Sequence, residues 1–370
     1  MKNILITGGA GFIGSHVAAE LLRHGYRVRV LDNLDPQVHG ESRRRPSYLD
    51  DNVELQIGDV RDAAAVEEAL GGIDGVFHFA AAVGVGQSMY ELAHYTSINN
   101  VGTAVLLEAL ARQPVEKLVV ASSMSLYGEG LYHDVHGRPA AARRSREQLA
   151  RREWEPYGPN GQTLEPAPTP ETKPADLSSV YALSKFDQER LCLMVGEAYD
   201  IPATALRFFN VYGPHQALSN PYTGVLAIFA SRCLNDRPPL IFEDGEQRRD
   251  FVSVHDVARA ARLAYESGAA AGRVFNIGSG QAFTIREIAQ KVAAAAGKPH
   301  LEPEITGRYR VGDIRHCFAD ISRARSILRY APEITLDQGL AEIAAWLATT
   351  QAVDRAAEAS AELDARGLTL

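Results

Sequence analysis

The sequence predicts an α/β protein in which a doubly wound parallel sheet is followed by a smaller α/β domain. Short apolar runs with the composition of buried strands alternate with amphipathic stretches of helical period through roughly the first 210 residues. A glycine-rich turn joins the first apolar run to the first amphipathic stretch, as this class of fold requires. With 370 residues, the chain is long enough for one large α/β unit and a second domain.

The expected elements follow one another in a regular order. Strands are predicted at 2–7, 27–31, 53–57, 75–81 and 115–121, and helices at 15–24, 63–70 and 99–111. Each strand is a short aliphatic or aromatic run, and each helix repeats its apolar residues every three or four positions. Because a helical stretch separates successive strands, the strands should run parallel, with helices on both faces of the sheet.

Composition gives no support for a nucleic-acid or membrane partner. Apolar residues make up 46% of the chain and charged residues 23%, and the net charge is −8, as in an ordinary globular enzyme. No apolar run approaches the ~18 residues of a membrane span. The cysteines Cys192, Cys233 and Cys317 lack metal-ligand spacing, so we expect no metal site, three buried thiols and a cytoplasmic protein.

The glycine-rich turn has the spacing of a dinucleotide-binding fingerprint. It contains Gly8, Gly11 and Gly14 between the first strand and the first helix, where the helix N-terminus would face a pyrophosphate. Asp32 ends the second strand 18 positions after Gly14, where an acid binds ribose hydroxyls and disfavours a 2′-phosphate. The alternative, a tight turn in an unrelated doubly wound fold, is disfavoured because all four features occur in order. We therefore predict a Rossmann-type domain that binds NAD rather than NADP.

Tyr181 and Lys185 form a YxxxK pair that would place both side chains on one face of a helix. A free tyrosine has a pKa near ~10 and is a poor base at neutral pH. We expect the Lys185 ammonium to favour the phenolate, which would make the pair an acid/base centre. Together with the dinucleotide fingerprint, this pair predicts hydride chemistry on an alcohol.

The motifs in combination resemble one enzyme family. They are Thr7-Gly8-Gly9-Ala10-Gly11-Phe12-Ile13-Gly14, Ser122-Ser123-Met124-Ser125-Leu126-Tyr127-Gly128, Tyr181-x-x-x-Lys185, Arg207-Phe208-Phe209-Asn210-Val211-Tyr212-Gly213-Pro214 and Arg249-Asp250-Phe251-Val252. The chain resembles the extended short-chain dehydrogenase/reductase family, in its nucleotide-sugar epimerase/dehydratase branch, over about 1–128 and 169–345.

The resemblance implies a role for each matching residue. Ser123 would hydrogen-bond the reacting sugar hydroxyl, Tyr181 would be the base and Lys185 would hold the nicotinamide ribose. The implied NAD contacts, including the fingerprint, are Gly8, Gly11, Phe12, Ile13, Gly14, Asp32, Asn33, Asp59, Val60, Phe79, Ala80, Ala81, Asn99, Tyr181, Lys185 and Phe208. The implied contacts to a nucleotide-diphosphate sugar are Ser123, Ser125, Asn210, Val225, Leu226, Phe242, Arg249, Arg310 and Asp313. Arginine suits a diphosphate because its planar fork meets phosphate oxygens in pairs.

Three regions are expected along the chain: a NAD-binding domain at 1–210, a nucleotide-sugar-binding domain at 211–347 and a polar helical tail at 348–370. Ser123 and Tyr181 lie 58 positions apart, a longer separation than is usual in the family. The extra material is an insertion at about 129–174. We expect it to be a lid or a partly disordered loop, with a short helix in 145–154. We expect its basic doublets, Arg143-Arg144 and Arg151-Arg152, to be solvated.

The resemblance leaves several reactions open and favours one. The family's dehydratases carry an Asp-Glu pair where this chain has Met124 and Ser125, its xylose-forming decarboxylases a Glu at the second position, and its 3,5-epimerases a Cys at the first. The bare Ser123–Tyr181–Lys185 set favours a 4-epimerase that oxidises C4 and returns the hydride to the opposite face. The subgroup most resembled acts on dTDP-L-rhamnose. UDP-glucose or UDP-glucuronate 4-epimerases, a 4-ketoreductase or dehydratase, and a non-catalytic NAD-binding scaffold remain alternatives.

The resemblance also implies a homodimer. Two amphipathic stretches, about 89–111 and 181–199, correspond to the helices that form a four-helix contact between subunits in the family.

Overall fold

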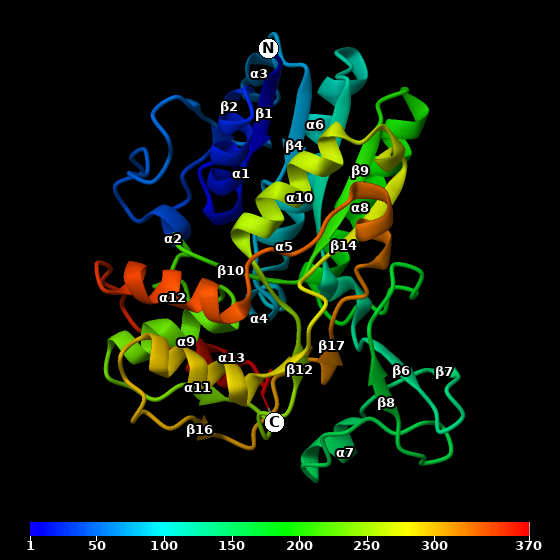
Figure 1. Cartoon of the computed structure of the whole chain (residues 1–370), viewed down its shortest axis with the longest axis vertical. Coiled ribbons are helices and arrows are strands. Elements are labelled where there is room, and N and C mark those ends of the chain that lie inside the picture. The colour runs from blue at the N-terminus through cyan, green and yellow to red at the C-terminus, as the bar shows by residue number, and fades with distance from the viewer. Residues whose placement is uncertain (370) are drawn as a thin grey trace.

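A seven-stranded sheet, parallel throughout, forms the centre of the larger domain in the computed structural model, which describes residues 1–369 (Figure 1). Its order is β14-β9-β5-β4-β1-β2-β3. The strands are β1 (Asn3–Thr7), β2 (Arg27–Asp32), β3 (Glu54–Ile57), β4 (Gly75–His78), β5 (Lys117–Ser123), β9 (Ala203–Phe208) and β14 (Arg273–Ile277). The chain order reverses between β1 and β4, and doubly wound sheets bind ligands at the carboxyl ends of strands at such a point. The predicted fold class is confirmed.

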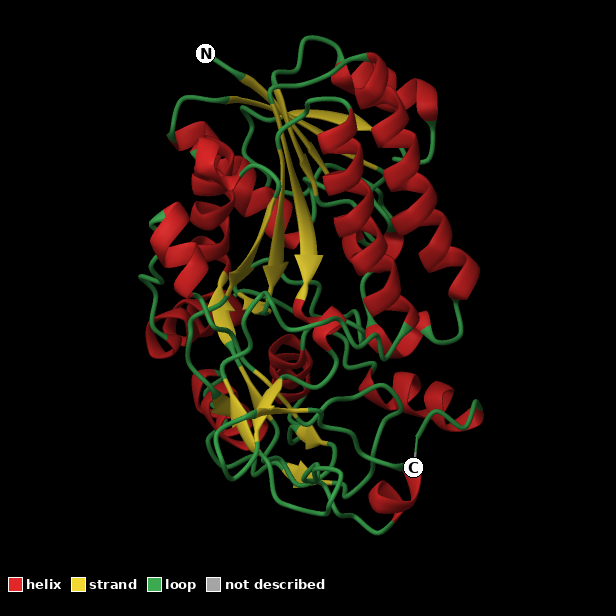
Figure 2. Ribbon diagram, turned by 90° about the vertical axis from the view of Figure 1, so that its right-hand side faces the viewer, coloured by secondary structure: helices red, strands yellow, loops and turns green. Residues whose placement is uncertain are grey.

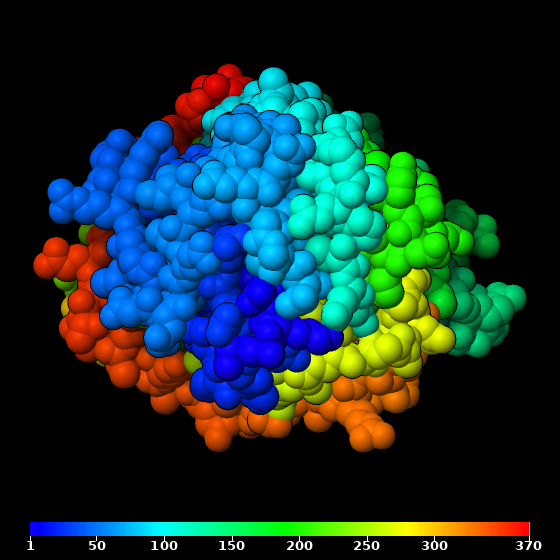
Figure 3. All heavy atoms as spheres, turned by 90° about the horizontal axis from the view of Figure 1, so that it is seen from above, coloured from blue at the N-terminus to red at the C-terminus, as the bar shows by residue number. Residues whose placement is uncertain are grey.

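Helices cover both faces of this sheet, which Figure 2 shows from the side. On one face lie α1 (Phe12–Arg23) and α10 (Val254–Glu266), and on the other α3 (Ala63–Leu70), α6 (Gly102–Arg112) and α8 (Val180–Ala198). Ile4 and Ile6 of β1 pack in the core with α1 and α10, whereas Leu5 packs in the opposite core, because strand side chains alternate between faces. In the view from above, the N-terminal segment (blue) lies beside the segment of α10 (yellow), although the two are far apart in sequence (Figure 3).

The helix expected at 99–111 belongs to a longer helical stretch. It begins with α5 (Leu92–Tyr95), continues through a π-helical turn η1 (Thr96–Val101) and ends with α6. A π turn inside a helix shifts the register of the side chains and is frequent at functional sites. Here the turn carries Asn99, one of the predicted NAD contacts.

The smaller domain is built from three helices and short strands around its own apolar core. Its helices are α9 (Val225–Leu234), α11 (Ile285–Ala295) and α12 (Leu336–Leu347). Its strands are β10 (Asn210–Tyr212), β11 (Leu240–Ile241), β12 (Arg248–Arg249), β13 (Phe251–Ser253), β15 (Phe283–Thr284), β16 (Glu304–Ile305) and β17 (His316–Cys317). The chain returns from this domain to the larger one with α10 and β14, so residues beyond 210 contribute to both.

The insertion is a folded unit, which corrects the expectation of a lid or partly disordered loop. Its strand β6 (Leu131–His133) pairs with β7 (Pro139–Ala140) and β8 (Glu165–Ala167). The expected short helix is α7 (Arg146–Ala150). Tyr132, Ala142 and Leu164 form a small apolar core of its own.

The remaining elements are short, except for the helix in the tail. They are α2 (Pro36–His39), α4 (Val85–Ser88), η2 (Met124–Tyr127), η3 (Gly268–Ala270), η4 (Ala324–Leu328) and α13 (Ala356–Ala365). The tail helix α13 buries Ala359 and Leu363, so it packs on the protein rather than projecting from it. Across residues 1–369, every helix is too short or too polar to cross a membrane.

Candidate active site

A cavity of about 420 Å³ opens where the carboxyl ends of the central strands meet the smaller domain. All but one of the predicted NAD contacts line it: Gly8, Gly11, Phe12, Ile13, Gly14, Asp32, Asn33, Asp59, Val60, Phe79, Ala80, Ala81, Tyr181, Lys185 and Phe208. Asn99 is the exception. Ser123, Asn210, Val225 and Leu226 from the predicted substrate contacts line the same cavity.

The glycine turn approaches its neighbours too closely for side chains. Gly8 has φ +69°, and a Cβ there would lie 2.8 Å from the backbone of Ala80. A Cβ at Gly14 would lie 2.5 Å from the carbonyl oxygen of Gly8. No side chain caps the N-terminus of α1, where Phe12 lines the cavity. The uncapped N–H groups and the helix dipole suit a phosphate group at this position.

Two acids lie along the wall of the cavity next to the glycine turn. Asp32 accepts hydrogen bonds from the backbone N–H groups of Ala10 (3.0 Å) and Leu34 (2.9 Å), which fix its carboxylate at the end of β2. Burial raises the pKa of Asp32, although these N–H groups oppose the shift. Hydrogen bonds from the Arg61 guanidinium lower the pKa of Asp59 to about 2, so this second carboxylate stays charged.

Ser123 and Tyr181 meet in the cavity from two different elements. Ser123 ends β5, and its Oγ accepts hydrogen bonds from the backbone N–H (3.2 Å) and the hydroxyl (2.9 Å) of Ser125. Tyr181 lies in the first turn of α8, where its backbone N–H donates to Ser88 Oγ (3.0 Å). The sheet brings together two residues that are 58 positions apart in the chain.

Lys185 does not lower the pKa of Tyr181 in the protein chain alone. Burial raises the pKa of the Tyr181 phenol, and contact with Ser123 only partly opposes the shift. The Lys185 ammonium donates instead to Gln188 Oε1 at 2.7 Å, and burial lowers its pKa to about 8. The expected effect of Lys185 on the phenolate is not seen here, because burial, which disfavours the charged form, dominates the pKa of Tyr181.

Gln188 connects Lys185 to a buried polar network that the motifs did not reveal. Its Nε2 donates to Thr103 Oγ1 (2.9 Å) and lies 3.2 Å from His78 Nε2. His78 Nδ1 lies 2.8 Å from Thr7 Oγ1, and burial lowers the pKa of His78 to about 3, so the ring is neutral. The sequence spacing could have indicated this contact, since Gln188 follows Lys185 by three positions and lies on the same helix face.

Asn99 acts behind the cavity wall rather than in it. Its Nδ2 donates to Ser184 Oγ (2.9 Å), and its Oδ1 accepts a hydrogen bond from the Ala82 backbone N–H (2.8 Å). The residue is fully buried. It joins the π turn to α8 and to the chain that follows β4.

Ser125 hydrogen-bonds Ser123, whereas the remaining predicted substrate contacts form a second group outside the main cavity. Arg310 pairs with Asp313 (2.8 Å), and its guanidinium lies 5.6 Å from the centre of the Phe242 ring. Arg249 donates to the carbonyl oxygens of Ile314 and Arg315, and among residues 1–369 it forms no ion pair with a carboxylate. A half-buried guanidinium that has carbonyl groups but no carboxylate as partners within residues 1–369 can bind an anion.

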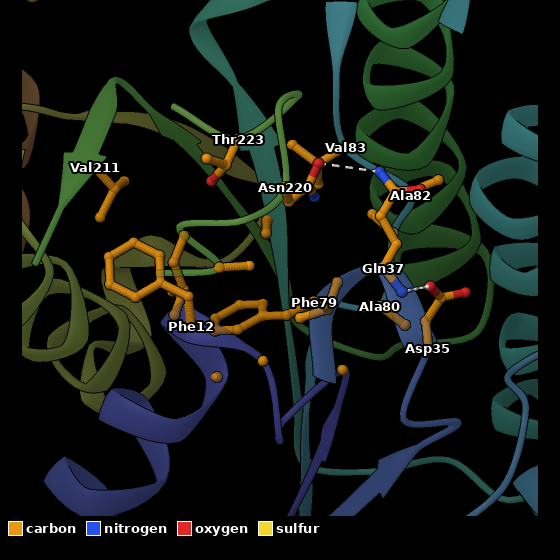
Figure 4. A pocket seen from close by; sticks show the side chains of 18 of the residues that line it. Phe12, Asp35, Gln37, Phe79, Ala80, Ala82, Val83, Val211, Asn220 and Thr223 are labelled. Carbon is orange, nitrogen blue, oxygen red and sulfur yellow. Dashed lines mark hydrogen bonds between the residues drawn. The ribbon is translucent and has the colours of Figure 1, made fainter. Parts of the chain in front are cut away.

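Gln37 crosses from the larger to the smaller domain at the cavity, a contact that the sequence did not indicate. It follows Asp35, whose carboxylate caps α2. Figure 4 shows its side chain pointing toward Asn220, and its Nε2 donates to Asn220 Oδ1 at 3.2 Å. The same amide donates to Gln87 Oε1 at 3.1 Å, so three amide side chains bridge the two domains.

The model of the NAD dependent epimerase/dehydratase family matches residues 4–151 and 154–278. The chain belongs to this family.

Curated relatives of the chain include 4-epimerases of nucleotide sugars and a UDP-N-acetyl-alpha-D-glucosaminuronate decarboxylase of Bacillus cytotoxicus, which is 29% identical over 93% of this chain and 97% of that relative. The chain is 38% identical to a dTDP-L-rhamnose 4-epimerase of Burkholderia thailandensis over 96% of both chains. It is 30% identical to a putative UDP-glucose 4-epimerase of Methanocaldococcus jannaschii, over 93% of this chain and 98% of that relative.

Solved structures in the family have the same fold. A UDP-glucose 4-epimerase of Thermotoga maritima with UDP-glucose is 31% identical, with a TM-score of 0.76 over 94% of this chain and 99% of that one. A UDP-glucuronic acid 4-epimerase of Bacillus cereus, in complex with UDP-glucuronic acid and NAD, is 27% identical, with the same TM-score and coverage.

Proposed function

We propose that this protein is an NAD-dependent nucleotide-sugar 4-epimerase, and that its substrate is dTDP-L-rhamnose, which it interconverts with dTDP-6-deoxy-L-talose. The observation that supports the proposal is one cavity in which the dinucleotide turn lies beside Ser123, Tyr181 and Lys185. The residues at the cavity fit NAD, because the glycine turn admits a pyrophosphate and Asp32 lies where ribose hydroxyls would be.

Each of the three side chains has a distinct task in the proposed reaction. Tyr181 takes the proton of the C4 hydroxyl while C4 is oxidised, and it returns the proton when the C4 carbonyl is reduced. Ser123 donates a hydrogen bond to the oxygen on C4. Lys185 holds the nicotinamide ribose. Bound NAD supplies the hydride chemistry, so the reaction needs no other oxidant or reductant.

Met124 and Ser125 argue against elimination and decarboxylation in this cavity. Met124 lies next to Ser123, is 9% exposed, and its Sδ accepts a contact from Asn210 Nδ2 at 3.6 Å. An elimination needs an acid and a base beside C5 and C6, and neither side chain has an ionisable group. A 6-deoxy sugar fits such a pocket because it has no C6 hydroxyl to eliminate.

The arginines outside the cavity support a nucleotide-diphosphate sugar as substrate. Arg249 carries a charge that no carboxylate neutralises in the described chain, which suits a diphosphate. Arg310, Asp313 and Phe242 lie together and would hold the nucleotide end, with the Phe242 ring against the base. We assign the diphosphate to Asn210 and Arg249.

The test is a panel of nucleotide sugars incubated with the enzyme and followed by NMR in deuterated water. We expect dTDP-L-rhamnose to be epimerised without added NADH and without deuterium at C4, because the hydride returns directly. Turnover of UDP-glucose or UDP-glucuronate instead would assign the chain to the activity named for other relatives. A stable 4-keto-6-deoxy product from dTDP-glucose would show a dehydratase, and net consumption of a reduced cofactor a ketoreductase. No turnover of any sugar would contradict the proposal and favour an NAD-binding scaffold.

We further propose that the protein acts as a homodimer in the cytoplasm. All three cysteines are buried and unpaired, which suits a reducing compartment. Helices α6 and α8 lie side by side, and α8 exposes Leu183 and Met194 by 45% and 50%. These two apolar side chains are about three helical turns apart on one face, which suits a helix-to-helix contact between subunits.

A further inference from the structure

We propose that the insertion, residues 129–174, positions the loop 307–316 that holds the nucleotide end of the substrate, and that Arg144 is the positioning residue. The inference rests on the proposed function, because it assigns Arg249, Arg310 and Asp313 to the substrate. It gives the insertion a role in substrate affinity rather than in the chemical step.

Arg144 connects the insertion to the smaller domain through a buried guanidinium. Its side chain is only 3% exposed. It donates to Glu129 Oε1 (3.1 Å) at the start of the insertion, to Glu243 Oε1 (2.6 Å) in the smaller domain, and to the carbonyl oxygen of Asp313 (3.1 Å). The expectation that this arginine is solvated is wrong, whereas Arg143 beside it is 84% exposed.

Glu129 holds the same loop from the insertion side. Its carboxylate accepts hydrogen bonds from the backbone N–H groups of Arg315 (2.8 Å) and His316 (3.2 Å). A second acid of the insertion, Glu155, pairs with the Arg315 guanidinium, which is itself only 2% exposed. The insertion therefore contacts both the backbone and the side chains of this loop.

The loop 307–316 carries the groups that we propose bind the substrate. Arg310 and Asp313 belong to it, and its carbonyl oxygens at Ile314 and Arg315 hold the guanidinium of Arg249. A shift of the loop would move both arginines at once. If an arginine guanidinium is displaced from the diphosphate, its paired hydrogen bonds to the phosphate oxygens are lost. We therefore expect a displaced loop to weaken substrate binding.

Opposite charges face one another throughout this contact. The carboxylates of Glu129, Glu243 and Glu155 face the guanidinium groups of Arg144 and Arg315. Burial raises the pKa of Glu243, and Arg144 and Arg315 oppose this shift. Removing Arg144 leaves a buried carboxylate with one partner fewer, which weakens the hold on Asp313 and its neighbours.

The test compares Arg144→Met with Arg143→Met, an identical change at the adjacent, exposed position. We expect Arg144→Met to raise KM for dTDP-L-rhamnose and Kd for dTDP, measured by calorimetry, by about tenfold or more. We expect kcat to change by less than about threefold and the NAD content to stay the same. Arg143→Met should behave as the parent protein. A lower kcat at unchanged KM, a loss of NAD, or equal behaviour of the two variants would overturn the proposal.

Two further variants keep the test decisive if Arg144→Met does not fold. Arg144→Lys keeps the charge but not the fork, and Glu155→Gln removes a half-exposed partner of Arg315. Either variant, if folded, should weaken dTDP binding at least threefold, and unchanged binding by both would overturn the inference. If the parent protein turned over no nucleotide sugar, the proposed function would fail, while the dTDP titrations would still decide whether Arg144 controls nucleotide affinity.

Discussion

Tyr181 illustrates how strongly burial governs single groups in this cavity. Its phenol lines the cavity at the first turn of α8, and desolvation there raises its pKa despite a lysine one turn away. Lys185 is buried and donates to Gln188 rather than to the phenol. Desolvation disfavours the charged form of both groups, so proximity in sequence alone does not create a phenolate–ammonium pair.

Tyr181→Phe should lower kcat by ~10²–10⁴ and leave substrate binding largely intact, because it removes the proton-transfer group and keeps the ring. The measurement is steady-state turnover of dTDP-L-rhamnose together with calorimetric binding. The control is Tyr199→Phe, at the exposed C-terminal end of the same helix. Near-normal turnover by Tyr181→Phe would show that another group moves the proton.

The alkaline limb of kcat/KM should report the ammonium of Lys185. Burial lowers its pKa to about 8, so the protonated form, which we expect to be the active one, is lost as the pH rises through that value. The groups facing it are Gln188, His78, Glu189 and Cys192. His78 is neutral and adds no charge near neutral pH.

Gln188→Glu should move that limb to higher pH, because a carboxylate beside the ammonium favours its charged form and raises its pKa. The measurement is kcat/KM between pH 6 and 10 for both proteins. Gln281→Glu makes the same change at an exposed position and should leave the limb in place. If the pKa of the alkaline limb is unchanged or lower in Gln188→Glu, the assignment of this limb to Lys185 is contradicted.

At the scale of elements, side-chain contacts between the two domains cross the cavity. The bridge from Gln37 to Gln87 and Asn220 joins α2, α4 and the loop before α9 across the cofactor side. An enzyme that regenerates its cofactor in every cycle gains from slow release. A bridge made of neutral amides holds the domains at modest cost, since each such hydrogen bond contributes about 1 kcal/mol.

Gln37→Ala should therefore speed the release of NAD by roughly three- to tenfold, since about 1 kcal/mol is lost per broken hydrogen bond. Stopped-flow displacement of NAD gives the rate. Gln281→Ala, at an exposed position of the smaller domain, serves as the matched control. Equal release rates in the two variants would mean that the bridge does not retain the cofactor.

At the scale of the whole molecule, helices α6 and α8 cover one face of the sheet and leave apolar side chains outside. Leu183 and Met194 of α8 and Val101 at the end of η1 are 45%, 50% and 50% exposed. Position 194 follows 183 by three helical turns, so both lie on one stripe. This stripe is where a second copy of the chain would pack if the protein is a dimer.

Met194→Glu should shift the protein from dimer to monomer, because it places a charge in an apolar contact. Light scattering at micromolar concentration gives the mass. Val135→Glu, at a 73% exposed position of the insertion, should leave the mass unchanged. A parent protein that is already monomeric at this concentration would contradict the proposed dimer.

The sequence by itself determined the parallel sheet and the place of the glycine turn, whereas most of the residues expected around the cofactor came from the resemblance to a known family. The sheet and the turn follow from local patterns: apolar runs, helical period, and glycines where a Cβ would meet the backbone of Ala80 or Gly8. The burial of the three cysteines was also predictable, because isolated cysteines behave as small apolar residues.

Only the tertiary structure decided which polar groups are buried together and what their partners are. Arg143 and Arg144 are adjacent and chemically identical, yet one is 84% exposed and the other 3%. Likewise, Lys185 turns to Gln188 instead of Tyr181, and a long Gly-, Pro- and Arg-rich segment folds into three strands. The physical reason is that burial and charge pairing depend on segments distant in the chain, such as 129, 243 and 313 around Arg144, which no local pattern can place.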